Sequence, residues 1–333
     1  MAATQNRDMG SGSIPKLLAQ LALPAVVAQV VNLLYNIVDR IYIGHMPEVG
    51  ASALTGVGLF TPILMLITAF AMLCGSGGAP RAAIAMGRGD DDAAEKIMGN
   101  CFTLLLILAA VLTVVFYFAA PSLLVLFGAS EKTLPYALDY ARIYIIGTIF
   151  VLIVMGMNPF VTTQGFATFS MMTTVIGAVC NIILDPILIF GLFGLPRMEV
   201  AGAALATVIG QFIAAGLSLF FNLTRNHDIQ FRFRGFRPDW GIIARIYSVG
   251  IPSIVMSSIG SVMVFGMNKI LISFTTTATA VFGIYFKLQS FIFMPVFGLN
   301  NGMIPIVAYN YGARSKKRIM ATVRMSIYIA VGI

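Results

Sequence analysis

TVIGAVCNIILDPILIFG, residues Thr174–Gly191, is a run of apolar residues interrupted by Asn181 and Asp185. A helix needs about 20 predominantly apolar residues to cross a bilayer, so this run favours a membrane span. A charged carboxylate in hydrocarbon is costly. It is therefore usually protonated, paired or placed at a wet cavity, and it marks a functional site by default. Asp185 is accordingly the first candidate functional residue.

The whole chain has the composition of a membrane protein. Of its 333 residues, 59% are hydrophobic and only 10% are charged, whereas soluble domains have about 25% charged residues. The net charge of +8 comes from Lys and Arg residues that fall mainly in alternate loops, a pattern that reports orientation in the membrane and not nucleic-acid binding. We therefore expect an all-α polytopic membrane protein.

Hydropathy predicts membrane-embedded segments at residues 17–44, 51–77, 97–120, 135–160, 163–191, 199–221, 242–273, 279–308 and 319–333. Most of the basic loop residues lie on one side if the N-terminus is cytoplasmic, so this orientation follows the positive-inside rule. We therefore expect a chain that crosses a membrane several times and has its N-terminus in the cytoplasm.

An internal repeat divides the chain. LALPAVVAQVVNLLYNIVDRIYIG from Leu21 resembles VGIPSIVMSSIGSVMVFGMNKILIS from Val249, and APRAAIAMGR from Ala79 resembles IPIVAYNYGA from Ile304. Six spans separate the copies, so both copies face the same way and are related by an axis along the membrane normal. The expected domains are a six-helix bundle over 1–224, a cytoplasmic linker over 225–240, and the start of a second bundle over 241–333 with helices 7, 8 and part of 9.

The repeat also predicts the length of the intact protein. At the offset of 225 residues between Ala79 and Ile304, Ile333 corresponds to Leu108, inside the third span of the first repeat. We therefore expect this chain to be a fragment, roughly 110–120 residues short of the full protein, with an incomplete second bundle.

Only two of the 13 acidic residues lie well inside the predicted spans, namely Asp39 and Asp185. Asp39 lies five residues before Gly44 and Asp185 six before Gly191, and both spans run outward. The two carboxylates are therefore expected at similar depth, in the outer part of the membrane. Neighbouring carboxylates share protons because their charges repel each other, so the pair suits proton coupling.

Several polar side chains are expected around this pair. Helical spacing places residues one turn earlier on the same face as each carboxylate, and small residues in AGAALATVIGQ allow close contact between helices. The expected members are Tyr35 and Asn36 beside Asp39, Asn181 beside Asp185, Thr207, and Asn158 and Tyr140 of the 135–160 span.

A structural explanation competes with the functional one. Asp39 can pair with Arg40 or a lipid headgroup, and Asp185 can cap a helix broken before Pro186. Pro24 permits a kink fifteen residues before Asp39 or is simply tolerated. Lys287 is a basic residue within a span of the second bundle; it can hold an anionic group, pair with a carboxylate or extend its amine outward to water.

Motifs of soluble enzymes are missing from the sequence. It has no Gly-rich phosphate loop followed by Lys-Ser/Thr, and His45 and His227 have no partners at metal-ligand spacing. We therefore expect neither an enzyme nor a bound cofactor or metal, and the energy for any transport comes from an ion gradient.

NIVDRIYIGH from Asn36, NPFVTTQG from Asn158, NIILDPILIFG from Asn181, GAALAT from Gly202 and PIVAYNYGA from Pro305 resemble the multidrug and toxic compound extrusion (MATE) family, and most of all its DinF-like and MepA-like branch. The resemblance implies a V-shaped pair of six-helix bundles that alternates between inward-open and outward-open states. It also implies a cation site of Asp39 and Asp185, supported by Tyr35, Asn158, Asn181 and Thr207 with Tyr140 nearby, and a hinge at Pro24. The glutamate that the NorM branch has in helix 7 is missing from GIPSIVMSSIGSVMVFGMNK.

The expected function is antiport, with export of amphipathic or cationic drugs in exchange for H⁺ or for Na⁺ bound at Asp39 and Asp185. The expected partners are small organic cations and the lipid bilayer, without nucleic acid, and the expected state is a monomer. The resemblance also implies a bacterial cytoplasmic (inner) membrane as the location. Two alternatives stay open: a lipid-linked oligosaccharide flippase of the same superfamily, and a non-transporting accessory membrane protein.

Overall fold

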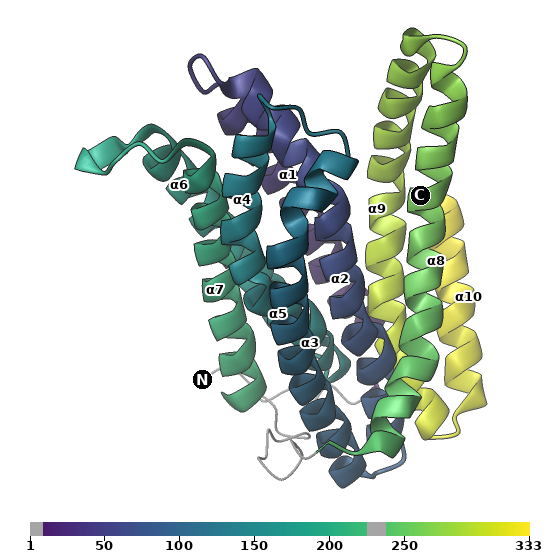
Figure 1. Ribbon diagram of the computed structural model, residues 1–333. Helices are drawn as coiled ribbons and strands as arrows, with labels where there is room; N and C mark the ends of the chain where they lie inside the picture. Colours follow the sequence, from purple (N-terminus) through teal and green to yellow (C-terminus); the bar gives the residue numbers. More distant parts are fainter. Residues whose placement is uncertain (1–8, 225–237) are drawn as a thin grey trace.

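The computed structural model describes residues 9–224 and 238–333, which form helices joined by short turns, without a strand among them (Figure 1). In chain order the elements are α1 (Ile14–Gly44), α2 (Gly50–Gly87), α3 (Asp91–Leu126), α4 (Leu134–Ile146), α5 (Thr148–Thr163), α6 (Ala167–Phe190), the 3-10 turn η1 (Leu192–Gly194), α7 (Glu199–Thr224), α8 (Trp240–Ile272), α9 (Thr276–Gly312) and α10 (Lys316–Gly332). The all-α fold that the sequence predicts is confirmed.

Each predicted span has a counterpart among the helices. Within the described residues, six helices are long and apolar enough to cross a membrane, and a seventh span results if the bent pair α4 and α5 counts as one. The remaining predicted spans, 242–273 and 319–333, correspond to α8 and α10. The chain is therefore a multi-pass membrane protein.

The span predicted over 135–160 is not one continuous helix. It consists of α4 and α5, which are bent by 53° at a break around Gly147. A Cβ atom on Gly147 would lie 2.5 Å from the side chain of Val208 in α7, which is too close for two carbon atoms. Glycine therefore lets α7 pass directly against this bend.

Acidic residues in two connections have a structural role. The Asp90 carboxylate accepts a hydrogen bond of 3.0 Å from the Ala93 amide and caps α3, while Gly89 takes a left-handed φ of 76° in the preceding turn. Asp239 caps α8 in the same way, through the Gly241 amide. Such caps satisfy backbone N–H groups that have no partner inside the helix.

The helices form two groups, which we call the first lobe (α1–α7) and the second lobe (α8–α10). In Figure 1 the second lobe, drawn in green and yellow, stands beside α2. Within the first lobe α6 packs against both α1 and α7, and between the lobes α1 contacts α9 while α2 contacts α8 and α9. Residues 225–237 of the predicted linker lie outside the described residues.

The contacts between the lobes occur in pairs that the internal repeat relates, α2 with α8 and α9 with α1. A Cβ atom on Gly77 of α2 would lie 2.5 Å from the Ile246 carbonyl oxygen of α8, and one on Gly302 of α9 would lie 2.6 Å from the Ala22 amide nitrogen of α1. Gly77 and Gly302 are related by the repeat offset of 225 residues. Matched contacts of this kind are expected of two parallel repeats related by rotation about one axis.

The two lobes touch at one end of the molecule, where α2 and α9 both end. A Cβ atom on Gly312 would lie 3.1 Å from the Cα atom of Gly87, so the two repeat-related glycines face each other. The N-terminal segment is bound at the same end, because Arg318 of α10 donates hydrogen bonds of 2.9 and 2.7 Å to the carbonyl oxygens of Met9 and Gly12.

Asn310 completes this attachment of the N-terminal segment. It is fully buried in α9 and donates from its side-chain amide to the Met9 carbonyl at 3.0 Å. Its side-chain oxygen accepts a hydrogen bond of 3.1 Å from Arg318.

Candidate functional site

Asp39 and Asp185 lie on two helices that pack against each other, α1 and α6. Asp185 is fully buried and Asp39 is 7% exposed. The two carboxyl groups are close enough to interact electrostatically. The structure thus brings together the pair that the sequence places at equal depth.

Asn181 joins α6 to α7 beside Asp185. Its side-chain amide donates to Oδ1 of Asp185 at 3.3 Å and to the Thr207 hydroxyl of α7 at 3.2 Å. The Thr207 hydroxyl in turn donates to the Ala203 carbonyl at 3.0 Å. Both amide hydrogens of Asn181 are therefore used, and its side-chain oxygen has no hydrogen-bond partner among the described residues.

Two facing glycines allow α6 and α7 to come this close. A Cβ atom on Gly210 of α7 would lie 2.6 Å from the Gly177 carbonyl oxygen, and one on Gly177 would lie 2.9 Å from the Gly210 carbonyl oxygen. Gly177 precedes Asn181 by one helical turn. The small residues of the α7 sequence therefore set the distance across which Asn181 reaches Thr207.

Three buried oxygens of this cluster have no hydrogen-bond partner in the described part of the chain: Oδ1 of Asp39, Oδ2 of Asp185 and Oδ1 of Asn181. All three are acceptors, at least when the carboxylates are ionised. A buried acceptor without a donor costs about 1–3 kcal/mol, and more when it is charged. A proton or a small cation bound in the cluster would give these oxygens the partners that they lack.

Neither structural explanation is met by a direct contact of the carboxylates. Among the described residues, ion pairing within 4 Å is found only between Arg197 and Glu199, so the Arg40 charge acts on Asp39 from a longer distance. The helix α6 continues through Pro186 to Phe190, so Asp185 lies inside the helix and does not cap its end.

Aromatic hydroxyls surround the carboxylates. Tyr35 of α1 interacts electrostatically with both Asp39 and Asp185, and Tyr140 of α4 interacts with Asp39. Tyr144, which was not among the predicted site residues, lies next to these tyrosines. It stacks on Tyr140, with ring centroids 5.9 Å apart. Its position one turn after Tyr140 in YALDYARIY is the signal that was available.

Two predicted members, Asn158 and Asn36, make hydrogen bonds to residues other than Asp39 and Asp185. The Asn158 amide of α5 donates to the Thr173 hydroxyl at 2.7 Å. Thr173 precedes Asp185 by 12 residues, which is about 18 Å of helix. Asn36 is exposed, and its amide donates at 2.7 Å to the Asn32 carbonyl of its own helix. The Asn36 side chain also interacts with the Tyr35 hydroxyl. Asn158 therefore lies away from the two carboxyl groups, whereas Asn36 adjoins the cluster through Tyr35.

Pro24 and Lys287 lie elsewhere. The helix α1 runs from Ile14 to Gly44 with Pro24 inside it, about 22 Å of helix away from Asp39. Its neighbours Ala22 and Val26 contact glycines of α9, so the proline lies at the contact between the lobes. Lys287 belongs to α9, but its side chain is outside the described residues.

The donor set is one of hard oxygen atoms. Carboxylate, amide and hydroxyl oxygens suit a proton or a hard cation such as Na⁺ better than a transition metal. In the described ranges 9–224 and 238–333, no group of three or more His, Cys, Asp or Glu side chains is arranged to hold a metal ion.

Comparison with known proteins identifies relatives along nearly the whole chain. The chain is 28% identical over 315 residues to the multidrug export protein MepA of Staphylococcus haemolyticus, which covers 95% of this chain and 68% of MepA. It is 26% identical over 320 residues to a protein of Shewanella oneidensis named FAD transporter, covering 95% of this chain and 70% of that protein.

A solved structure has the same fold. The outward-facing conformation of a multidrug resistance MATE family transporter of the MOP superfamily superposes with a TM-score of 0.90 at 26% identity, covering 99% of this chain and 72% of that one. The MatE family model matches residues 24–187 and 252–333, two segments that begin at the repeat-related Pro24 and Pro252. The chain therefore belongs to the MatE family, whose members are membrane transporters.

Proposed function

We propose that this protein is a secondary antiporter that exports amphipathic organic cations in exchange for protons, with Asp39 and Asp185 as the proton carriers. The observation that carries the proposal is the pair of buried, electrostatically coupled carboxyl groups, each with an oxygen that lacks a partner among the described residues. Membership of a transporter family and the drug-export names of relatives support the same function.

Coupling follows from the electrostatics of the pair. Two adjacent negative charges in a poorly hydrated site repel each other and lose hydration, so the site favours any state in which a positive charge neutralises them. A proton and an organic cation supply that charge in different ways. Occupancy by one therefore weakens binding of the other, and the effect is reciprocal.

Export requires that the proton-loaded and proton-free sites favour different arrangements of the lobes. We infer that Pro24 is the hinge, since it interrupts the hydrogen bonding of α1 at the level where α1 contacts α9. Asp39 lies on the same helix, so a bend at Pro24 changes the position of one carboxylate relative to its partner on α6.

Sodium coupling is the other version of this proposal. Asp39, Asp185, Asn181 and Thr207 can offer oxygen ligands to Na⁺ without further change of the cluster. A sodium-coupled protein retains efflux under a sodium gradient at equal pH on both sides, whereas a proton-coupled protein needs the pH gradient. We place the N-terminus in the cytoplasm and expect a monomer in the cytoplasmic membrane.

The test is ethidium efflux from proteoliposomes under separately imposed proton and sodium gradients. Asp39→Asn and Asp185→Asn should reduce gradient-driven efflux to the protein-free background, because each keeps the shape of the side chain but removes its titratable group. The matched control is Asp139→Asn on the exposed face of α4, which should transport like the wild type. Wild-type efflux by both Asp39→Asn and Asp185→Asn would refute the proposal.

A second candidate substrate is a flavin nucleotide, since one relative is named FAD transporter. FAD is anionic at its phosphates, so it does not neutralise two carboxylates as an organic cation does. Release of entrapped FAD, but not of ethidium, from the same proteoliposomes would favour this candidate. Family membership favours either export function over an accessory role without transport.

A further inference from the structure

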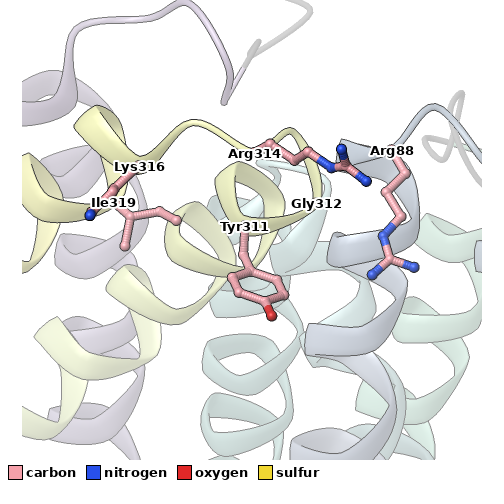
Figure 2. A pocket seen from close by; sticks show the side chains of 6 residues that line it. All are labelled: Arg88, Tyr311, Gly312, Arg314, Lys316 and Ile319. Atoms are coloured by element: carbon pink, nitrogen blue, oxygen red, sulfur yellow. The ribbon is translucent and has the colours of Figure 1, made fainter.

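A basic hollow lies between the two lobes at the end where they touch. Figure 2 shows Arg88 at the end of α2 and Arg314 in the turn that joins α9 to α10, whereas Lys316, at the start of α10, points its amine to the opposite side of the hollow. Its volume is about 500 Å³, and its lining consists of Arg88, Tyr311, Gly312, Arg314, Lys316 and Ile319. A water molecule takes up about 30 Å³ in the liquid, so the hollow has room for a hydrated polar headgroup.

The charge of the lining is all of one sign. Three of the six residues are cationic and none is acidic. Within the described residues none of the three forms an ion pair within 4 Å. Asp90, two residues after Arg88, accepts a hydrogen bond from the Ala93 amide and caps α3. The hollow therefore presents positive charge that no protein anion balances within it.

The backbone at Arg314 sets the direction of its side chain. Its φ is 56°, in the left-handed region that glycine and asparagine occupy much more readily than arginine. Here it turns Arg314 at the corner between α9 and α10, and Figure 2 shows its guanidinium group near that of Arg88.

The position of the hollow suits a lipid headgroup. It adjoins the Gly87 and Gly312 contact, at the end of the bundle where the hydrophobic helices stop and basic residues begin. Tyr311 is 63% exposed there, as expected of an aromatic ring at the level of the headgroups. Ile319 adds an apolar side chain on the α10 side, where an acyl chain can continue.

We propose that this hollow binds a phosphate-bearing anion, the headgroup of an anionic phospholipid, with Arg88 of the first lobe and Arg314 of the second lobe sharing one phosphate group and Lys316 adding positive charge at the edge of the hollow. Guanidinium groups bind phosphate oxygens in a fixed, often bidentate geometry, which makes two arginines from opposite sides an effective clamp. This site is separate from the carboxylate cluster and its occupancy does not depend on the proposed transport function.

A ligand that bridges the lobes also has a conformational consequence. The phosphate contacts both lobes only while the ends of α2 and α9 are in contact, so binding stabilises that arrangement. By reciprocity, any change that separates these ends weakens phosphate binding by the same factor.

The experiment measures binding of phosphatidylglycerol, phosphatidylcholine and inorganic phosphate to the purified protein in a neutral detergent, by native mass spectrometry and by thermal stabilisation. Phosphatidylglycerol should bind more tightly than phosphatidylcholine. Removing one guanidinium group, in Arg88→Gln or Arg314→Gln, should weaken phosphatidylglycerol binding about fivefold, which corresponds to about 1 kcal/mol. Arg314→Lys, which keeps the charge, should recover part of the loss.

The matched control is Lys317→Gln, an exposed neighbour of Lys316 that does not line the hollow. It removes the same charge from the same face and should change binding by less than about twofold. Equal losses of affinity in Lys317→Gln and Arg88→Gln would show that binding depends on the overall positive charge of this end and would overturn the proposal. Equal affinities for the two lipids would overturn it as well.

Inorganic phosphate distinguishes the source of the anion. If phosphate displaces phosphatidylglycerol with the same dependence on Arg88 and Arg314, the site recognises the phosphate group itself, and free phosphate suffices as a ligand. If phosphatidylglycerol keeps that dependence but phosphate does not displace it, the ligand is the intact lipid. Loss of folding in a variant is recognised by its unfolding temperature without lipid, which should equal that of Lys317→Gln.

Discussion

Replacing Gly87 by alanine should separate the two lobes at the end where they now touch. A Cβ atom on Gly87 would lie 2.0 Å from the Tyr309 carbonyl oxygen, and ordinary van der Waals contact begins at 3.4 Å. The backbones of α2 and α9 must therefore part by 3.4 − 2.0 = 1.4 Å along this direction, or the helices must tilt. Neither partner can yield through a flexible side chain, because the atoms in contact belong to the main chain.

The free-energy change is set by overpacking. Adding a methyl group to a closely packed contact typically costs about 1–3 kcal/mol. Alanine is also a better helix former than glycine by about 1 kcal/mol, but this gain applies in every arrangement of the lobes and cancels. The touching arrangement should therefore lose about 5- to 150-fold in population relative to an arrangement with these ends apart.

Pulsed electron spin resonance measures this change as a distance. Spin labels at Phe118 in α3 and Phe274 after α8 report on the far ends of the two lobes, and both side chains are at least 75% exposed. The background carries Cys180→Ser, since Cys74 and Cys101 are fully buried. In Gly87→Ala a second, shorter distance should appear, because lobes that part at one end approach at the other.

Two further variants make the measurement decisive. Gly312→Ala places its methyl group 2.1 Å from the Ile84 carbonyl oxygen and should have the same effect as its repeat partner Gly87→Ala. Gly58→Ala lies in the same helix α2 as Gly87, but no heavy atom is within 4 Å of its Cβ position, so its distance distribution should equal that of the parent. Identical distributions in Gly87→Ala and Gly58→Ala would refute the reasoning.

Two other predictions concern single hydrogen-bonded side chains. Thr207→Val removes the hydroxyl that accepts a hydrogen bond from the Asn181 amide and leaves a buried donor unpaired. Because an unpaired group costs about 1–3 kcal/mol, efflux in the ethidium assay should fall about tenfold. Thr207→Ser keeps the hydroxyl and should stay near wild type. Equal activity of the valine and serine variants would contradict a role for this hydroxyl. Arg318→Gln removes both hydrogen bonds to Met9 and Gly12, so limited proteolysis should cleave the N-terminal segment faster than in Lys317→Gln, and an unchanged rate would show that the segment is held by other contacts.

Depth along a helix was enough to predict the centre of the candidate site. Asp39 and Asp185 precede the outer ends of their helices by five and six residues, and helix geometry converts equal counts into equal depth. Asn181 followed from its position one turn before Asp185. Thr207 followed from the depth of the returning helix, and the structure joins it to Asn181 as a hydrogen-bond acceptor.

Depth separates Asn158 from Tyr140 in the same predicted span and leaves its role a prediction. Asn158 lies 158 − 140 = 18 residues after Tyr140, which is about 27 Å of straight helix. Tyr140 interacts with Asp39, whereas Asn158 donates to Thr173. The span is also bent by 53° around Gly147. Hydropathy does not predict this bend. At the bend, the Val208 side chain of α7 occupies the space that a Cβ atom on Gly147 would take. The last ten residues of α2 lie beyond the predicted end at 77. They were missed because a helix can continue past the point where hydropathy falls.

The attachment of the N-terminal segment has a consequence for biosynthesis. Met9 accepts hydrogen bonds from Asn310 and Arg318, which lie 301 and 309 residues later in the chain. At about 5–20 residues per second, a ribosome needs about 15–60 s to make that interval. Throughout this time the segment at Met9 waits without these two partners, while helices α1 to α9 are made. A probe attached to this segment therefore reports when α9 and α10 have docked against the first lobe.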